Sequence, residues 1–279
     1  MSNLGGAYIS KLDRYELKYI IPTEVIEPMT EYLMRYCTLD YHSKTSPDSF
    51  YPVNSLYYDT PNYTFLKNRL YTKNPRFNMR ARAYGYEPKP PYFLEIKYKD
   101  SNMVNKYRCS IDDEEWPRMF TDMEYRTHLQ GKESEMINKE LFYVTAIKYA
   151  ATPKIFTQYR RRAFVSEMDE YVRVTMDIDM CCHLEENYNL IPDKDKLIPY
   201  DNELVYVKET NRTMGSCCIL ELKCYPHQVP LWMIDMIRQF QLTRTSFSKY
   251  AQSILTIKEL DVYHNLHFNF NDRQSILYK

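Results

Sequence analysis

The sequence predicts an α+β fold in which an antiparallel β-barrel of eight strands carries helices packed on its outside. About eight segments alternate charged and apolar residues with the period of two that is typical of a β-strand. Helical patterns fall in a few blocks and do not alternate with the strands, which disfavours a parallel sheet. The 279 residues contain no obvious linker. We therefore expect one domain over residues 11–258 and a C-terminal tail over residues 259–279.

Strands are expected wherever charged and apolar side chains alternate between two faces. The clearest segment covers residues 93–99, where Leu94 and Ile96 would line one face and Glu95 and Lys97 the other. The same pattern predicts strands over residues 12–21, 53–61, 77–84, 105–110, 154–163, 171–179 and 219–223. The strands of the first half would form a meander of antiparallel hairpins.

Helices are expected where apolar residues recur at helical spacing. Ile26, Met29 and Leu33 give such a stripe to a helix over about residues 24–36, after the proline that ends the first strand. Pro230 would open another amphipathic helix, because proline is tolerated in the first turn. Further helices are expected near residues 62–70, within residues 112–150 and from about residue 246.

The composition excludes several classes of function. The chain has only 5 glycines and no glycine-rich phosphate loop, so it would have to bind phosphate with side chains. Its 37 basic and 37 acidic residues give no net charge that would steer it to nucleic acid or to a membrane. Any functional charge must therefore be segregated locally.

The cysteines and the N-terminal residues indicate a cytoplasmic protein. The seven cysteines include two adjacent pairs and no C-x-x-C spacing, which fits neither a disulfide framework nor a zinc site. The first residues lack the features of a signal peptide, and no apolar run is long enough to span a bilayer. We therefore expect a reducing, cytoplasmic setting.

The charged faces of the expected strands are mainly basic. Their basic residues are Lys18, Arg80, Arg82, Lys97, Lys106, Arg108, Arg161, Arg173 and Lys223. Their acidic residues are Glu16, Glu95 and Glu221. The opposite faces carry Leu17, Leu56, Leu94, Ile96, Val172, Val174, Leu220 and Leu222. Since solvated faces of a neutral chain usually mix both signs, this basic excess suggests a face that binds anions.

Two arrangements are compatible with this pattern. In a sandwich, the apolar faces would form the core and the charged faces would meet solvent. In a barrel, helices would cover the apolar faces, and the charged faces would line a wet bore that accepts polyanions such as phosphate. We favour the bore, because arginine suits multivalent oxyanions through its fork of donors.

The few carboxylates on these faces predict a divalent cation. A metal ion that bridges carboxylate and phosphate oxygens would give them a role, and Mg²⁺ or Mn²⁺ suits such oxygen ligands. Glu221 is the first choice as ligand and Glu16 the second. For each glutamate the alternative is an ion pair with a neighbouring lysine or arginine.

A series of short motifs resembles a known family. The motifs, in order, are Arg14–Tyr19, Ser55–Pro61, Arg80–Arg82, Leu94–Lys97, Tyr159–Phe164, Arg173–Asp177, Leu220–Lys223 and Ser248–Tyr250. Together they resemble the VTC domain, the polyphosphate polymerase branch of the triphosphate tunnel metalloenzymes (CYTH-like superfamily). The resemblance covers about residues 11–258. It implies an eight-stranded tunnel in which a Mn²⁺- or Mg²⁺-dependent enzyme transfers the γ-phosphate of ATP to a polyphosphate chain.

The resemblance also implies roles for particular residues. The substrate-binding set would be Lys18, Arg80, Arg82, Lys97, Lys106, Tyr159, Arg161 and Arg173, to which the strand pattern adds Lys223. Ser248 and Lys249 would lie at the reacting end and act in catalysis with Arg80, Arg82 and Lys97. Glu221 would hold the metal.

Some features depart from the family pattern and leave alternatives open. Arg14 replaces the first glutamate of the E-x-E-x-K motif of the wider superfamily, which makes a pure hydrolase less favoured. The sequence also lacks the SPX module and membrane segments of the eukaryotic complex, so a stand-alone version with a membrane-protein partner is an option. The alternatives to a polymerase are a tripolyphosphatase or organic triphosphatase, and a non-catalytic polyphosphate-binding module. The oligomeric state is not indicated.

Overall fold

The chain forms two compact units in the computed structural model. The structure describes residues 15–71, 76–100, 103–112, 115–122, 124, 132–169, 171–201 and 217–259. Val53–Thr157 and His183–Lys196 belong to the first unit, and Leu12–Pro52, Gln158–Cys182 and Leu197–Lys279 to the second. The expected tail therefore lies, from residue 260 onward, outside the described residues.

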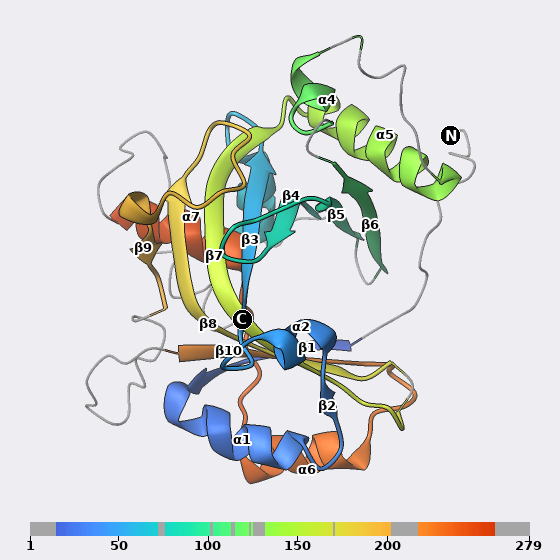
Figure 1. The fold of residues 1–279 in the computed structure, drawn as a ribbon, viewed down its shortest axis with the longest axis vertical. Coiled ribbons are helices and arrows are strands. Elements are labelled where there is room, and N and C mark those ends of the chain that lie inside the picture. Colours follow the sequence, from blue (N-terminus) through green and yellow to red (C-terminus); the bar gives the residue numbers. More distant parts are fainter. Residues whose placement is uncertain are drawn as a thin grey trace. The chain divides into compact units, whose positions relative to one another are not determined.

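The first unit is an antiparallel meander with helices beside it. Its strands are β3 (Tyr51–Asp59), β4 (Arg76–Tyr84), β5 (Tyr92–Asp100), β6 (Met103–Ile111) and the beginning of β7 (Thr152–Val165). They are hydrogen-bonded in the order β7-β3-β4-β5-β6. The helices are α3 (Thr64–Leu70), α4 (Arg118–Thr121) and α5 (Glu133–Lys148), and η3 (Lys194–Lys196) is a 3-10 turn. The helix α5 packs along β6 and β5 (Figure 1).

Aromatic side chains fasten the helices of the first unit to its sheet. Tyr58 on β3 makes an edge-on contact with Phe142 of α5, at 5.5 Å between ring centroids. Phe120 stacks on Tyr188 at 5.1 Å. The indole of Trp116 donates a hydrogen bond of 2.8 Å to the carbonyl oxygen of Tyr188. This packing turns the apolar face of the meander toward the helices and leaves the other face for charged side chains.

The second unit contains the remaining strands and the remaining helices. The strands β1 (Tyr15–Pro22), β10 (Cys217–Cys224) and β8 (Arg173–Leu184) are hydrogen-bonded in the order β1-β10-β8-β7. Two short strands lie off this path: β2 (Thr38–Leu39) pairs with β7, and β9 (Ile198–Pro199) with β8. The 3-10 turn η1 (Thr23–Val25) precedes the helices α1 (Ile26–Leu33), α2 (Tyr41–Thr45), α6 (Leu231–Gln239) and α7 (Lys249–Glu259).

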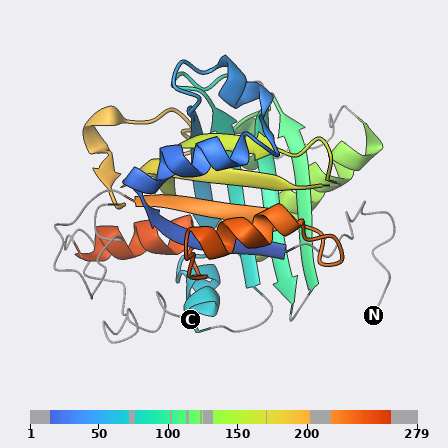
Figure 2. The same ribbon diagram turned by 90° about the horizontal axis from the view of Figure 1, so that it is seen from below.

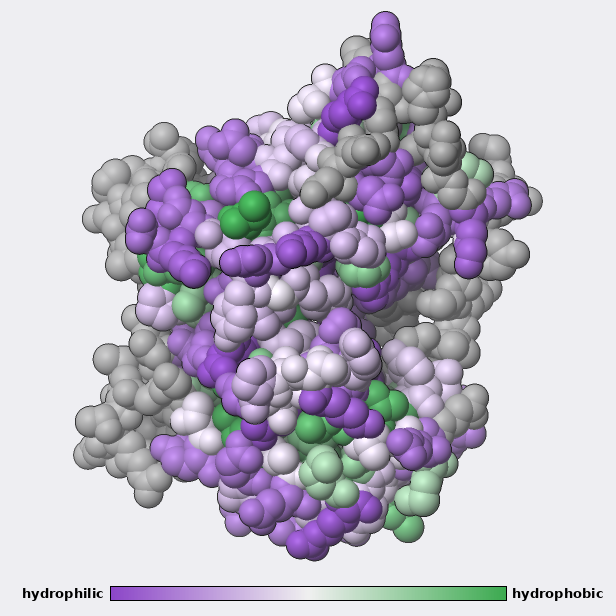
Figure 3. Space-filling view, in the orientation of Figure 1, coloured by the Kyte–Doolittle hydropathy of each residue, from purple (hydrophilic) through white to green (hydrophobic). Residues whose placement is uncertain are grey.

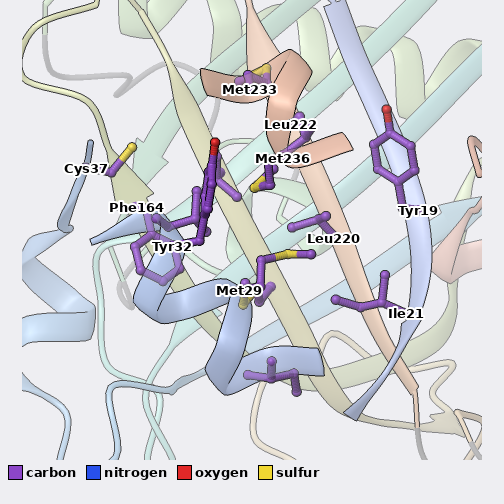
Figure 4. Packing of buried hydrophobic residues seen from close by; sticks show 14 of the residues in the cluster. Tyr19, Ile21, Met29, Tyr32, Cys37, Phe164, Leu220, Leu222, Met233 and Met236 are labelled. Carbon is purple, nitrogen blue, oxygen red and sulfur yellow. The ribbon is translucent and has the colours of Figure 1, made fainter. Parts of the chain in front are cut away.

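The core of the second unit lies between its sheet and two helices. The helices α1 and α6 run across one face of β1, β10 and β8 (Figure 2). Met29 of α1 and Met236 of α6 pack on Leu220 and Leu222 of β10, and all four are fully buried (Figure 4). The expectation that amphipathic helices cover the apolar faces of the strands is confirmed in this unit.

The predicted fold class is confirmed in its main features and not in its closure. The described strands form an antiparallel sheet with helices, and eight of them follow one hydrogen-bonded path. That path begins at β1 and ends at β6, so the structure does not confirm a closed barrel for the described part of the chain. Strands β7 and β8 span 14 and 12 residues, more than the alternation pattern predicted.

The described surface is mostly polar. Hydrophilic residues cover much of the face in Figure 3, and hydrophobic residues gather there in small patches. Among the helices that the structure describes, none has the length and apolarity needed to cross a membrane.

The core of the second unit predicts a large effect of truncation at Leu220. Leu220→Ala removes a fully buried side chain between β10 and the helices and should lower the free energy of unfolding by ~2–5 kcal/mol. Urea unfolding followed by circular dichroism measures this loss. Leu231→Ala is the matched control, because Leu231 is 78% exposed, and it should change stability by less than ~0.5 kcal/mol. Equal effects of the two substitutions would contradict this description of the core.

Candidate anion-binding site

In the first unit, strand register places several cations around one glutamate. Glu95 on β5 is the direct partner of Arg80 on β4 and of Arg108 on β6. Directly opposed residues of neighbouring strands project from the same face. The register therefore gathers basic side chains of three strands on the face opposite the helices.

Glu95 is a buried carboxylate with four basic neighbours. Its Oε2 lies 2.6 Å from Nη2 of Arg80 and 3.8 Å from Nη2 of Arg82. Its Oε1 lies 3.4 Å from Nζ of Lys106 and 3.8 Å from Nε of Arg108. Only 3% of the Glu95 side chain is exposed, against 46% for Lys106 and 41% for Arg108. One negative charge therefore stands against four positive charges, and the side chains of Lys106 and Arg108 are the most exposed of the four.

The electrostatics of this cluster follow from that imbalance. Burial acts to raise the pKa of Glu95, but the four cations, Arg80 foremost, hold it well below its ordinary value. Arg80 also donates a hydrogen bond of 3.1 Å from Nη1 to the hydroxyl of Tyr57. The carboxylate is thus ionised at any physiological pH and fixes the guanidinium groups, while the cluster keeps a positive excess.

Two further positions on the same face bring like charges together. Lys97 on β5 is the direct partner of Lys106 on β6, and Arg76 on β4 is the partner of Lys99. Like charges directly opposed across two strands destabilise a sheet. A bound polyanion would relieve this repulsion.

Arg69 and Arg76 belong to this basic group and were not found by sequence reasoning. Burial, together with the nearby charge of Arg76, lowers the pKa of Arg69 to about 10. Arg69 lies in α3, a segment in which the sequence indicated only a helical patch. No strand alternation marks it, because the direction of a helical side chain depends on how the helix packs. Arg76 lies just before the expected start of its strand, so the alternation pattern missed it by one residue.

In the second unit, a buried aspartate holds two of the expected site residues. The carboxylate of Asp177 accepts hydrogen bonds from Nε and Nη2 of Arg161, at 2.7 and 2.9 Å. Its Oδ2 also accepts a hydrogen bond of 2.6 Å from Nζ of Lys249. Asp177 is completely buried. Arg161 and Lys249, which are far apart in the sequence, are therefore brought to one carboxylate.

Each group in this triad stabilises the charged form of the others. Burial acts to raise the pKa of Asp177, but Arg161 and Lys249 lower it to about 2. Burial acts to lower the pKa of Lys249, yet Asp177 keeps it above its ordinary value. Arg161 responds in the same way, and its pKa is raised well above the usual range despite its burial. All three groups are charged near neutral pH, with one net positive charge.

The ring of Tyr159 makes cation–π contacts with Lys249 and Arg161. Nζ of Lys249 lies 4.3 Å from the centroid of its ring, and Cζ of Arg161 lies 5.3 Å from it. Cation–π attraction of this kind strengthens when the groups are desolvated, as they are here. The hydrogen bond of Tyr159 to phosphate that the resemblance implies remains a prediction.

The segment before α7 explains how Lys249 reaches the sheet. Arg244 forms an isolated bridge with Tyr19 of β1, and the backbone N–H of Thr245 donates to the carbonyl oxygen of Lys18 at 2.8 Å. Lys18 returns a hydrogen bond of 3.1 Å from Nζ to the carbonyl oxygen of Phe247. The hydroxyl of Ser248 then accepts from the backbone of Ala251 and caps the helix. These contacts place Ser248 and Lys249 close to β1.

The expected metal ligands lie on the charged face of β1 and β10. Glu221 is the partner of Lys18, and Glu16 is the partner of Lys223, so the two carboxylates are diagonal neighbours on one face. Glu221 also forms an ion pair of 3.2 Å with Lys223. Arg173, the partner of Lys223 on β8, makes an ion pair of 2.9 Å with Asp40.

The donor set suits a metal ion that shares its ligands with phosphate. No group of three or more histidine, cysteine, aspartate or glutamate side chains capable of holding a metal occurs among the described residues. Mg²⁺ is commonly held by one or two carboxylates together with substrate phosphates and water. Glu221 and Glu16 fit that mode, and they do not fit a closed site made by protein ligands alone.

The structure thus collects the expected site residues in two groups, one in each unit. The first unit holds Arg80, Arg82, Lys97 and Lys106. The second unit holds Glu16, Lys18, Tyr159, Arg161, Arg173, Glu221, Lys223, Ser248 and Lys249. Arg14, from the first motif, lies outside the described residues.

Comparison with known families identifies the chain. The family model described as the VTC domain matches residues 13–258, which is most of the chain. The chain belongs to the VTC domain family. The VTC match contains both groups of candidate site residues.

Comparisons with solved structures and with curated proteins give weaker information than the family match. A protein from Bacillus halodurans, named as a candidate adenylate cyclase, matches with a TM-score of 0.47 and 10% identity, over 85% of this chain and 96% of its own. A protein from Pyrococcus horikoshii matches with a TM-score of 0.41 and 11% identity, over 89% and 99% of the two chains. No curated protein matches the sequence. Likenesses this distant say nothing about the activity of the VTC chain.

The triad of Asp177 predicts a specific acid sensitivity. Because the pKa of Asp177 falls from 3.8 to about 2 on folding, its ion pairs should contribute ~2 kcal/mol of stability above about pH 4. This contribution should disappear as the pH falls through about 2. Asp177→Asn should therefore lower the free energy of unfolding at neutral pH and flatten its decline between pH 4 and pH 2. Urea unfolding at a series of pH values measures both effects.

Asp235→Asn is the control for this experiment. The ion pair of Asp235 with Arg238 is exposed, so this substitution should keep the wild-type profile. If Asp177→Asn showed the wild-type slope as well, Asp177 would not be the carboxylate that holds these cations.

Proposed function

We propose that this VTC domain is a polyphosphate polymerase-like phosphotransferase, which moves the γ-phosphate of ATP onto a polyphosphate chain with the help of Mn²⁺ or Mg²⁺. The observation that carries the proposal is the positive excess on the charged face of each unit. Glu95 neutralises one of four cations, and Asp177 one of two. A polyanion is the ligand that such a surface favours, and the family match narrows the polyanion to a triphosphate or polyphosphate.

The chain's own residues would act by binding and positioning. Phosphoryl transfer requires little covalent help from a protein and depends on alignment and on neutralising the phosphate oxygens. Arg80 and Arg82, fixed by Glu95, would hold the phosphates in the first unit. In the second unit Asp177 would hold Arg161 and Lys249 with their charges directed to the ligand. The closed tunnel of eight strands also belongs to this proposal.

A metal ion would be held by Glu221, with Glu16 as the second carboxylate. When bound, it would supply positive charge to the phosphate oxygens that it shares with these carboxylates. Lys18 and Lys223 compensate the same carboxylates in its absence, since they are their strand partners. Metal and ligand are therefore expected to bind together, and excess EDTA should abolish turnover.

The deciding experiment is to incubate the protein with ATP and Mn²⁺ and to size the phosphate products by gel electrophoresis. Chains that lengthen with time support the polymerase. Free phosphate as the sole product would replace the proposal with a triphosphatase. Binding of polyphosphate without turnover would replace it with a non-catalytic binding module. A membrane-protein partner remains a prediction of the sequence.

Substitution of the clustered arginines should weaken the binding of ligand. Arg80→Ala or Arg173→Ala removes a charge-assisted contact and should weaken tripolyphosphate binding by ~1.5–3 kcal/mol, roughly 10- to 150-fold. Isothermal titration calorimetry with Mn²⁺ present measures the change. Arg160→Ala is the control, because Arg160 points to the other face of β7 and pairs with Asp48 and Asp179. Full binding by both test variants would refute the assignment of these faces.

A further inference from the structure

A buried hydroxyl group lies in the middle of the charged face of the second unit. Thr175 on β8 is only 2% exposed, yet its Oγ1 makes no hydrogen bond with any other described residue. Buried polar side-chain atoms nearly always have a partner, and an unsatisfied hydroxyl lowers the stability of the folded state. Valine, which has the same shape, would fill this strand position without that penalty.

The position of Thr175 is set by strand register. Its sequence neighbours Val174 and Met176 are buried in the core under α1 and α6, so Thr175 projects from the opposite face. There it is the direct partner of Glu221 on β10. Arg173 and Asp177 lie two residues away on the same strand and therefore on the same face.

The charged neighbours of Thr175 are engaged with other groups. Glu221 contacts Lys223, Asp177 contacts Arg161 and Lys249, and Arg173 contacts Asp40. The hydroxyl thus has charged side chains beside it on β8 and β10, and it forms a hydrogen bond with none of them. Its χ1 rotation is restricted by β-branching, so the position of Oγ1 is well defined, and the hydroxyl hydrogen can rotate toward an acceptor. Because Thr175 is only 2% exposed, a ligand would reach this hydroxyl by displacing the side chains that cover it.

We infer that Thr175 is a phosphate-binding residue, whose hydroxyl donates a hydrogen bond to a phosphate oxygen of the bound triphosphate or polyphosphate. This inference rests on the proposed function, because it assumes that a phosphate ligand occupies the charged face. A neutral donor suits the position, because the hydroxyl adds a contact to phosphate without changing the balance between Arg173 and the carboxylates of Glu221 and Asp177. In the ligand-free protein the unsatisfied hydroxyl lowers the stability of the folded state. A hydrogen bond from this hydroxyl to a charged phosphate oxygen would offset that cost when the ligand binds.

The first unit repeats the arrangement. Ser55 on β3 is completely buried, and its Oγ also finds no hydrogen-bond partner among the described residues. Its direct partner is Arg82, one of the four cations around Glu95. A small buried hydroxyl without a hydrogen-bond partner among the described residues therefore lies beside the basic cluster of each unit.

The test compares two substitutions at Thr175. Thr175→Val removes the hydroxyl and keeps the shape, and Thr175→Ser keeps the hydroxyl. With Mn²⁺ present, Thr175→Val should raise the Kd for tripolyphosphate about 10-fold, and Thr175→Ser should keep it within about 2-fold. The Tm of Thr175→Val without ligand should equal or exceed that of the wild type, because an unsatisfied polar group has been removed. A purely structural hydroxyl would give the opposite pattern.

Ser166→Ala is the control for a hydroxyl with a purely structural role. The buried hydroxyl of Ser166 donates to Oδ2 of Asp169 at 2.8 Å in the turn between β7 and β8. Its removal should lower the Tm and leave the Kd for tripolyphosphate unchanged. Thr175→Val would overturn the inference if it behaved like Ser166→Ala. A wild-type protein that binds no tripolyphosphate would overturn it as well.

A titration with Mn²⁺ alone separates the phosphate from the metal. If Thr175→Val weakened Mn²⁺ binding without any phosphate ligand, the hydroxyl would serve the metal near Glu221, and the phosphate assignment would be wrong. The inference is also distinguishable from the proposed function. A protein that makes no polymer, but whose tripolyphosphate affinity falls in Thr175→Val, would retain Thr175 as a phosphate-binding residue and lose only the polymerase.

Discussion

The pairing of buried carboxylates with a larger number of cations governs both candidate groups of site residues. Taking a charge out of water is costly unless an opposite charge compensates it, and Glu95 and Asp177 supply that compensation. Each carboxylate fixes its partners without neutralising all of them. The arginines and lysines can therefore be partly buried and held in place, and still attract an anion.

This arrangement depends on the two-sided character of the strands. The helices α1 and α6 cover the apolar side of β10 and β8. The alternate residues of these strands project from the opposite side, where charged side chains can be accommodated. A shift of one residue in strand register would exchange the two sides, placing leucines among the cations and arginines in the core. The packing of α1 and α6 thus keeps the charged side chains on the opposite face, although these two helices contribute no side chain to that face.

Much of this organisation could be predicted from the sequence, because strand alternation is a local property. The alternation assigned Leu94 and Glu95 to opposite faces, and the structure agrees. Contacts that depend on the path of the chain could not be predicted. Asp177 meets Lys249, which is 72 residues away, and Arg69 reaches its cluster from a helix. The absence of a hydrogen-bond partner for Thr175 among the described residues is likewise a property of three-dimensional packing.

The contact between α7 and the sheet also bears on how this protein would respond to a truncating mutation. Lys249 is the first residue of α7, and its ammonium group compensates the buried Asp177. A premature stop codon before this helix would leave the aspartate with one cation in place of two, deep in the fold. Selection against such truncated alleles would then act through misfolding and degradation of the shortened chain, in addition to any loss of activity.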